Sequence, residues 1–284
     1  MISFAKRNLK LFFKDKSAVF FSLLGVFIII GLYALFLGDV WTKSLKEISN
    51  ARELMDCWIM AGLVAATSVT TTMGAFGTMV EDKVKKISKD FSSSPLKRSS
   101  IAGGYVVSAY VIGVIMSVVA LVLAQIYLVA SGGAMLSLVA IVKCLGIILL
   151  ATITSTSIVL FIVSFFNSTN AFATASTVIG TLIGFLTGIY IPVGSLPDAV
   201  QTFVKIFPIS HAAVLLRQVI MKDQLKIAFK GVPAKYLTEF NEMMGVTFKF
   251  GDYEVTTFVS IAILIGTAAL FFTLSVLNIS RKNR

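Results

Sequence analysis

The sequence predicts an all-α polytopic membrane protein with six transmembrane helices, and three observations support this fold class. Of the 284 residues, 57% are hydrophobic and 14% are charged, whereas a typical soluble domain has about 25% charged residues. Six stretches are apolar over about 20 residues or more, the length that a helix needs to cross about 30 Å of hydrocarbon. Strands of a membrane barrel would be about ten residues long and would alternate in polarity.

The spans are expected at about residues 18–38, 57–80, 101–130, 136–166, 171–193 and 255–279. The third and fourth are long enough to be tilted or to extend beyond the bilayer. The first has an apolar core of about 21 residues, longer than the 7–15 of a signal peptide, and no small-residue cleavage site follows it. We therefore expect it to be a true span, with Trp41 and Trp58 in an aromatic belt at the outer interface. Packing in the core is the alternative for each Trp.

The net charge of +11 gives an orientation. Residues 1–16 carry +4, residues 81–100 carry +3 and the tail after residue 280 carries +3. Lys and Arg accumulate in short cytoplasmic segments beside membrane spans, and these three segments alternate correctly for six spans. We therefore expect a multi-pass protein of the cell membrane with both termini in the cytoplasm.

Composition and motifs exclude several other classes. A disordered chain would be less hydrophobic, and a nucleic-acid binder this basic would be less apolar. Cys57 and Cys144 make no disulfide framework, and we expect free membrane-embedded thiols rather than a bond between them. The sequence has no phosphate-binding G-x-x-x-x-G-K-[ST] motif, no H-E-x-x-H and no G-x-S-x-G. The lone His211 makes no zinc site, and we expect it at a surface or interface and expect no metal.

Residues 1–16 form the first of three segments with a pattern of their own. Apolar side chains recur at steps of three and four on one face, and cations recur on another, which indicates an amphipathic helix at the cytoplasmic membrane surface. The alternative is a plain cluster of charges that sets topology. The residues expected to act at this interface are Lys6, Arg7, Lys10, Phe13 and Lys14.

The inner loop, residues 81–100, is the second segment. Val84, Ile87 and Phe91 are spaced for a short amphipathic helix that ends at three serines and Pro95. A short helix on a cytoplasmic loop has the right shape to dock into a groove on another protein, and a solvated basic loop is the alternative.

Residues 194–254 form the third segment, which we expect outside the cell. Two apolar stripes of about 10–13 residues flank Pro208, and each is too short to cross the bilayer at about 1.5 Å per residue. They predict a re-entrant or interfacial helix pair before the last span, which includes Phe203, Pro208, His211 and Arg217. A small lobe with turns at Gly231, Gly245 and Gly251 then follows.

None of the expected spans has Asp or Glu in its interior, and Lys143 can extend outward. Ion-coupled transporters usually have intramembrane carboxylates, so the energy for any transport would come from ATP hydrolysis by a partner. Hydroxyl side chains do enter the second, fourth and fifth spans. We interpret them as helix-packing groups, with a role in lining a pathway as the alternative.

This arrangement resembles the permease subunits of type-2 ATP-binding-cassette (ABC) exporters over the whole chain. The resemblance rests on the amphipathic amino-terminal helix, the six spans, the basic inner loop with Ser94-Pro95-Leu96 and the re-entrant pair. Its most specific part is KIFPISHAAVLLRQVI, Lys205 to Ile220, preceded by GIYIPVGSLPDAV. The inner loop opens with the Lys-rich EDKVKKISKD, where many relatives have Glu and Gly. The Lys-to-Arg ratio also suits an AT-rich bacterial genome.

The resemblance implies a permease domain over residues 17–284 that has no ATPase site or cofactor of its own. A separate ABC ATPase subunit would bind ATP and Mg, and a second permease, identical or related, would complete the transporter. The inner-loop helix would dock into the ATPase through Val84, Lys85, Ile87, Ser88, Phe91 and Pro95. The pathway would run along the permease interface, lined by the first, second and fifth spans, with Phe21, Phe27, Thr67, Thr71, Thr181 and Thr187 as its candidate residues.

The function that we expect is ATP-driven export of a hydrophobic or amphipathic substrate, such as a drug, an antimicrobial peptide or a lipid. Export of a polysaccharide or glycolipid by a permease of the same family is one alternative. A non-transporting membrane subunit, for immunity or sensing, is another. A neighbouring gene for an ABC ATPase would favour a transporter.

Overall fold

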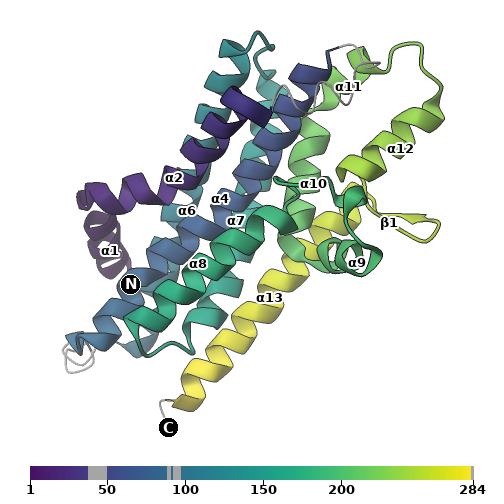
Figure 1. The fold of residues 1–284 in the computed structure, drawn as a ribbon. Helices are drawn as coiled ribbons and strands as arrows, with labels where there is room; N and C mark the ends of the chain where they lie inside the picture. Colours follow the sequence, from purple (N-terminus) through teal and green to yellow (C-terminus); the bar gives the residue numbers. More distant parts are fainter. Residues whose placement is uncertain (38–49, 88–90, 92–96, 283–284) are drawn as a thin grey trace.

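The computed structural model describes residues 1–37, 50–87, 91 and 97–282, and it confirms the predicted all-helical membrane fold (Figure 1). Six helices of this part are long and apolar enough to span a membrane. The helices of the bundle are α1 (Ile2–Lys14), α2 (Lys16–Leu32) with a π-helical turn η1 (Tyr33–Leu37), α4 (Ala51–Val84), α6 (Arg98–Ala130), α7 (Leu138–Val163), α8 (Thr169–Leu186) and α13 (Thr257–Lys282).

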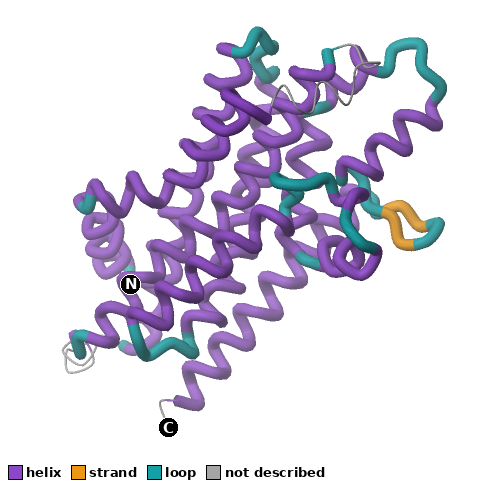
Figure 2. Tube along the Cα trace, viewed as in Figure 1, coloured by secondary structure: helices purple, strands orange, loops and turns teal. Residues whose placement is uncertain are grey.

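Between α8 and α13 the chain forms a bent helix pair and a small lobe, and the described strands form a single hairpin there (Figure 2). Positive φ angles at Gly231, Gly245 and Gly251 confirm the three predicted turns of the lobe. The elements are η2 (Val193–Ser195), α9 (Asp198–Ile206), α10 (Pro208–Ile220), α11 (Lys222–Ala228), α12 (Ala234–Met244), β1 (Lys249–Phe250) and β2 (Tyr253–Glu254), with Lys249 paired to Glu254 and Phe250 to Tyr253.

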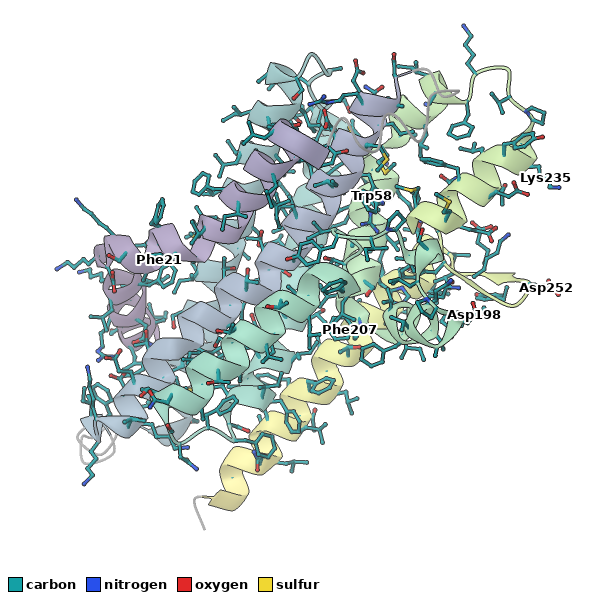
Figure 3. All side chains as sticks on the ribbon, in the orientation of Figure 1. Phe21, Trp58, Asp198, Phe207, Lys235 and Asp252 are labelled. Carbon is teal, nitrogen blue, oxygen red and sulfur yellow. The ribbon has the colours of Figure 1, made fainter. Side chains whose placement is uncertain are left out.

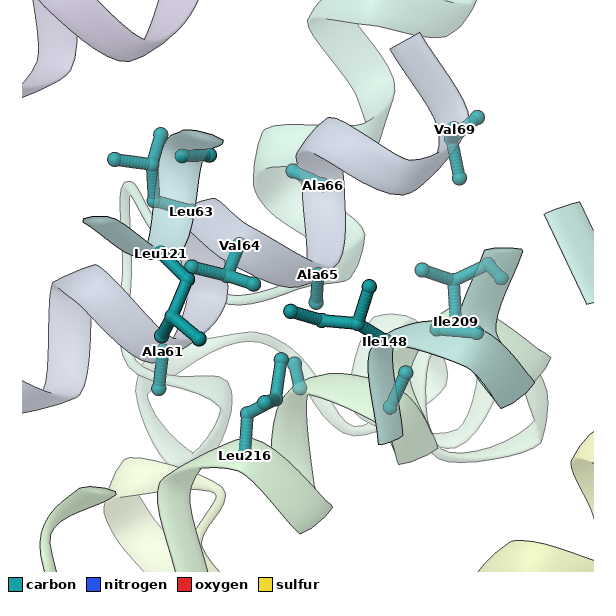
Figure 4. Packing of buried hydrophobic residues seen from close by; sticks show 14 of the residues in the cluster. Ala61, Leu63, Val64, Ala65, Ala66, Val69, Leu121, Ile148, Ile209 and Leu216 are labelled. Carbon is teal, nitrogen blue, oxygen red and sulfur yellow. The ribbon is translucent and has the colours of Figure 1, made fainter. Parts of the chain in front are cut away.

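Helix α4 is the centre of the bundle. It contacts α2, α6, α7, α8 and α10, and 89% of its most apolar stretch of 18 residues is buried in the protein. Its central turns are rich in alanine, so neighbouring helices can approach closely, and Leu121, Ile148 and Leu216 from three other helices pack beside Ala61 and Ala65 (Figure 4). With 34 residues, α4 is about 51 Å long at about 1.5 Å per residue, so it is longer than the hydrocarbon layer is thick.

The bounds of α4 differ from the predicted span 57–80. The helix includes Asp56 and Asp82, and both side chains are buried near its two ends. Both carboxylates lie outside the predicted span, so the middle of α4 has no Asp or Glu, and it is the bounds of the helix that are corrected. The Tyr127 hydroxyl donates to Asp56 Oδ1 at 3.2 Å, and this neighbouring hydrogen bond lowers the cost of burying that carboxylate.

The structure places one of the two tryptophans and both of the cysteines inside the bundle. Trp58 is completely buried, and its indole Nε1 donates to the carbonyl of Met244 at 2.6 Å, so it belongs to the core rather than to an aromatic belt. The other proposed belt residue, Trp41, lies beyond the residues described. Cys57 and Cys144 are buried free thiols.

Helices α2 and α8 are the most exposed of the spans. In their most apolar stretches of 18 residues, only 17% of α2 and 11% of α8 are buried within the chain. Helix α8 has 18 residues and is therefore about 27 Å long, shorter than about 30 Å of hydrocarbon. Its C-terminal end stops short of the N-terminal end of α4, and α10 occupies the bundle beyond that point (Figure 1).

Helices α9 and α10 meet at an angle of 84°. Phe207 between them is extended, and Pro208 occupies the first turn of α10, where a fixed φ and a missing N–H group carry no penalty. Helix α9 keeps one exposed face, whereas α10 packs among α4, α7 and α13. The predicted helix pair is present, and its second member is buried inside the bundle.

Candidate translocation cleft and coupling end

An open cleft of about 450 Å³ lies between α2, α4 and α8, within the range of about 300–1,000 Å³ that is usual for small-molecule sites. Figure 3 shows Phe21, one of its residues, on α2. The cleft is lined by Phe12, Ala18, Phe21, Ser22, Gly25, Val26, Ile29, Leu63, Ala66, Thr67, Thr70, Met73, Gly74, Ser176, Ile179, Gly180, Ile183, Gly184, Ile189 and Tyr190.

The cleft is apolar with scattered hydroxyl groups, and no lining residue in the described part of the chain is charged. Its Ser and Thr hydroxyls donate to carbonyls of their own helices: Thr67 to Leu63 at 2.8 Å and Ser22 to Val19 at 2.7 Å are examples. These hydroxyl oxygens therefore face the cleft only as acceptors. Such a surface suits apolar or amphipathic molecules and gives no counter-charge to a small ion.

The end of α8 shapes one wall of the cleft. The ring of Tyr190 lies against Gly184, where any Cβ atom would overlap the ring, and it packs edge-on against Phe185 with centroids 5.0 Å apart. A left-handed turn at Gly188 brings Tyr190 back over the helix. Two glycines thus allow this aromatic side chain to lie in the cleft.

The six predicted lining residues occupy different places. Phe21 and Thr67 line the cleft. Thr71 and Thr187 are buried and donate to carbonyls one turn earlier in their helices, as packing groups do. Phe27 and Thr181 are exposed on α2 and α8 and do not line the cleft. Sequence reasoning missed Tyr190, whose role depends on the turn at Gly188.

Helix α1 is fastened to the end of α4 by a charged network. Arg7 Nη1 and Nη2 donate to the two carboxylate oxygens of Asp82 at 2.8 and 3.2 Å, and the Tyr105 hydroxyl donates to the same carboxylate at 2.6 Å. The hydrogen bond from Arg7 to Asp82 raises the pKa of the guanidinium. A second hydrogen bond joins α1 to α6: Asn8 Nδ2 donates to Ser108 Oγ at 3.3 Å.

Aromatic contacts extend this network to the inner loop. The Phe4 ring packs edge-on against Phe91 and Tyr105, at 5.0 Å in each case, and the Arg7 guanidinium lies 5.0 Å from the centre of the Phe91 ring. Gly104 of α6 leaves the space that Phe4 fills. Helix α1, the end of α4, the start of α6 and Phe91 therefore form one packed unit.

The buried face of α1 shares only Ala5 and Phe12 with the apolar stripe that the sequence predicts, Ile2, Ala5, Leu9, Phe12 and Phe13. It consists of Phe4, Ala5, Asn8 and Phe12, and it packs mainly on α6 and α2. Ile2, Leu11 and Phe13 remain exposed. Of the predicted interfacial cations, Lys6, Lys10 and Lys14 are exposed and Arg7 is half-buried against Asp82.

The predicted docking residues lie where the chain leaves α4. Val84 is the last residue of α4 and is 41% exposed, and Lys85 forms an exposed ion pair with Glu81. The chain then turns at Lys86, which has a left-handed φ of 62°, and Ile87 and Phe91 are helical. Ser88 and Pro95 fall among the residues that are not described.

We call the unit formed by α1, the end of α4, the start of α6 and Phe91 the candidate coupling end. A polar hollow of about 500 Å³ joins it to the cleft. Phe12, Ala18 and Gly74 line both the cleft and the hollow. Asp15, Glu81, Asp82, Arg7 and Lys85 line the hollow further out. The apolar cleft therefore continues into a charged mouth beside α1.

The helix pair contains two buried polar side chains, His211 and Arg217. We expected His211 at a surface or interface, and its burial corrects that expectation. His211 is fully buried. Its Nε2 lies 2.9 Å from the carbonyl of Lys205, so this nitrogen must carry the proton, and Nδ1 then accepts from Ser260 Oγ at 3.1 Å. The two bonds join α10 to α9 and α13, and Phe203 of α9 is exposed nearby.

Arg217 of α10 is 1% exposed. Nη2 donates to the carbonyls of Thr187 and Gly188 at 2.7 and 3.2 Å, and Nη1 donates to that of Gly245 at 3.3 Å. Its guanidinium lies 4.8 Å from the centre of the Trp58 ring. The carbonyls that end α8 and α12 carry partial negative charge, so this one cation holds the ends of two helices against α4.

A helical bundle with six candidate spans and an apolar cleft beside its central helix defines a polytopic membrane protein. The sequence profile of the ABC-2 family transporter proteins matches residues 49–277, so the chain belongs to this family. Its members are membrane permease domains without an ATPase site of their own, and they work with ABC ATPase subunits. Among curated proteins, none is significantly similar to this chain.

Proposed function

We propose that the chain is the membrane subunit of an ATP-driven exporter that moves a hydrophobic or amphipathic compound, such as a drug, an antimicrobial peptide or a lipid, out of a bacterial cell. The observation that carries this proposal is the cleft between α2, α4 and α8, which has apolar walls, hydroxyl acceptors and no charged lining residue among those described. The charged hollow that continues from it would accept the polar end of an amphipathic molecule.

A second permease copy, identical or related, would close the cleft. The low burial of α2 and α8 within one chain supports a partner at this side, because these helices carry glycines and hydroxyl groups that suit helix packing. Of the six candidate pathway residues, Phe21 and Thr67 lie at the cleft itself, and the exposed Phe27 and Thr181 would face the second copy. The buried Thr71 and Thr187 would act behind the pathway as packing groups.

The partner ATPase, which would hold ATP and Mg, is proposed to bind at the coupling end. Helix α1, the C-terminal end of α4 and the C-terminal end of α13 carry or adjoin the three basic segments, and they lie at the same end of the bundle (Figure 1). The preference of Lys and Arg for the cytoplasmic side supports a cytoplasmic location for both termini. The exposed Val84 and Lys85 and the half-buried Ile87 would form the contact, together with Ser88 and Pro95. Phe91, packed on Phe4 and Arg7, would link the contact to α1.

Filling the cleft tests the site. Gly25 lines the cleft, and a Cβ atom there would meet nothing within 4 Å, so the side chain of Gly25→Phe can leave the backbone freely and add bulk to the cleft. With the ATPase from the neighbouring gene co-expressed, we expect at least a tenfold loss of transport of fluorescent amphiphiles into inverted vesicles. Gly266→Phe is the matched control, since Gly266 on α13 is equally unobstructed and does not line the cleft. Equal transport by both variants would contradict the proposal, and stimulation by glycolipid alone would assign a glycan exporter.

Docking is tested separately. Val84→Asp puts a charge on an exposed apolar residue at the coupling end, and we expect it to reduce co-purification of the ATPase and to uncouple ATP hydrolysis from transport. Val232→Asp is the matched control, because Val232 is 42% exposed and lies in the lobe at the other end. Unchanged ATPase binding by the Val84 variant would remove this residue from the proposed contact.

A further inference from the structure

A second cavity lies on the other side of α8 from the cleft. It has a volume of about 240 Å³ and is lined by side chains of α4, α7, α8, α9 and α10. We call it the α8–α9 pocket. Its lining side chains are apolar except for Ser155, whose hydroxyl is hydrogen-bonded to that of Ser68 at 2.9 Å. The pocket therefore has no free polar group to hold water.

The pocket opens at the surface of the membrane-spanning bundle. Leu182 of α8 is 51% exposed and Phe203 of α9 is 61% exposed at its rim. Phe203 stacks on Phe207 with ring centroids 6.4 Å apart, so α9 forms an aromatic roof over the opening. Figure 3 shows Phe207 where α9 meets the bundle. The pocket is thus a lateral opening between spans rather than a closed internal void.

The surroundings determine what can occupy it. An apolar cavity with no spare hydrogen-bonding group stays dry, and an empty one loses van der Waals contacts along its whole lining. Between two spanning helices, the surrounding solvent is the hydrocarbon of the bilayer. A linear acyl chain matches both the chemistry of the lining and the side from which the pocket opens.

We propose that the α8–α9 pocket is a binding site for one hydrocarbon chain of a membrane phospholipid. The site has a consequence for the cleft, because Ile179 and Ile183 of α8 line both cavities. Helix α8 alone therefore separates the cleft from the pocket. The bound acyl chain fills the space on the pocket side of α8, so the helix cannot move into that space and away from the cleft.

The test uses the purified full-length chain in phosphatidylcholine vesicles that contain a trace of phosphatidylcholine with a photoactivatable diazirine in its acyl chain. After illumination, adducts are mapped to peptides by mass spectrometry. We expect adducts concentrated at Ile158–Ile162 of α7 and Phe203–Phe207 of α9, above the density on exposed residues of α13 such as Phe258.

Two tryptophan variants make the test specific. Leu182→Trp places an indole in the mouth of the pocket and should lower its adducts at least fivefold. Val178→Trp is the matched control, because Val178 lies one turn earlier on α8, is also 51% exposed and lines neither cavity; its adducts should match the wild-type yield. If Leu182→Trp fails to fold, Ile162→Phe fills the pocket from α7 instead.

Several outcomes would overturn the proposal. These are a uniform adduct density over all exposed spans, an equal effect of the two tryptophans, or a pocket free of adducts because a second copy of the chain covers it. The measurement needs neither ATP nor transport. Its failure therefore leaves the proposed export function untouched, and failure of export leaves the lipid site standing.

Discussion

Removal of the Arg217 side chain should destabilise the protein strongly. Arg217→Met keeps much of the length and apolar character of the side chain but leaves the carbonyls of Thr187, Gly188 and Gly245 without their donor. A buried acceptor that loses its partner costs about 1–3 kcal/mol. The guanidinium charge is compensated by these three carbonyls and the Trp58 ring, but Nε has no partner among the described residues, so removing the charge offsets part of the loss.

We therefore take the lower end of the range for each carbonyl, which gives a loss of about 3 kcal/mol. Large domains lose about 2–4 °C in Tm per kcal/mol, so the expected decrease is about 6–12 °C. The assay is thermal unfolding in detergent, followed by the fraction of protein that still elutes as a single species. Arg217→Lys should also lower Tm, because an ammonium lacks the fork that binds the ends of α8 and α12 together.

Lys143→Met is the control for loss of a positive charge. Lys143 is exposed on α7, and surface substitutions of this kind usually change stability by less than about 0.5 kcal/mol. A Tm within about 2 °C of wild type for Arg217→Met, or full stability of Arg217→Lys, would refute the view that this guanidinium holds two helix ends together.

Three further predictions concern other parts of the chain. Asp82→Asn should lower Tm, by losing the charge-assisted bonds to Arg7 and Tyr105, and combining it with Arg7→Gln should cost less than the sum of the two single changes; additive losses would argue against coupling. Gly184→Ala should displace the Tyr190 ring and lower Tm, with recovery in the double variant Gly184→Ala, Tyr190→Ala. Cys57 and Cys144, buried and free, should react with a maleimide only after denaturation, and rapid labelling of the native protein would contradict their burial.

The spans could be predicted because they depend on local composition. Continuous apolar runs and the position of Pro208 are visible in the sequence, and they gave the six helices and the bent pair. The ends of α4 could not be placed the same way, since Asp56 and Asp82 are polar residues whose burial is made possible by partners far away in the chain, Tyr127, Arg7 and Tyr105.

The cleft was harder to predict than the fold for a similar reason. Thr67 and Thr71 lie one turn apart on α4, yet only Thr67 faces the cleft, because the packing of α2 and α8 decides which face stays open. The burial of His211 and Arg217 was also hidden from the sequence. Ser260 and Thr187, which bind these two side chains, lie outside Lys205 to Ile220, so no pattern within that stretch reports them.

The length of α4 has a mechanical consequence. One unbroken helix carries Trp58, bonded to the lobe, near one end and Asp82, bonded to α1, near the other; 24 residues separate them, or about 36 Å at about 1.5 Å per residue. If α4 is stiff and its middle is held by the surrounding helices, a tilt imposed at one end of the helix displaces the other end in the opposite direction. Spin labels placed at the two ends would measure that movement directly, and ends that move in the same direction would show that the helix slides or bends instead.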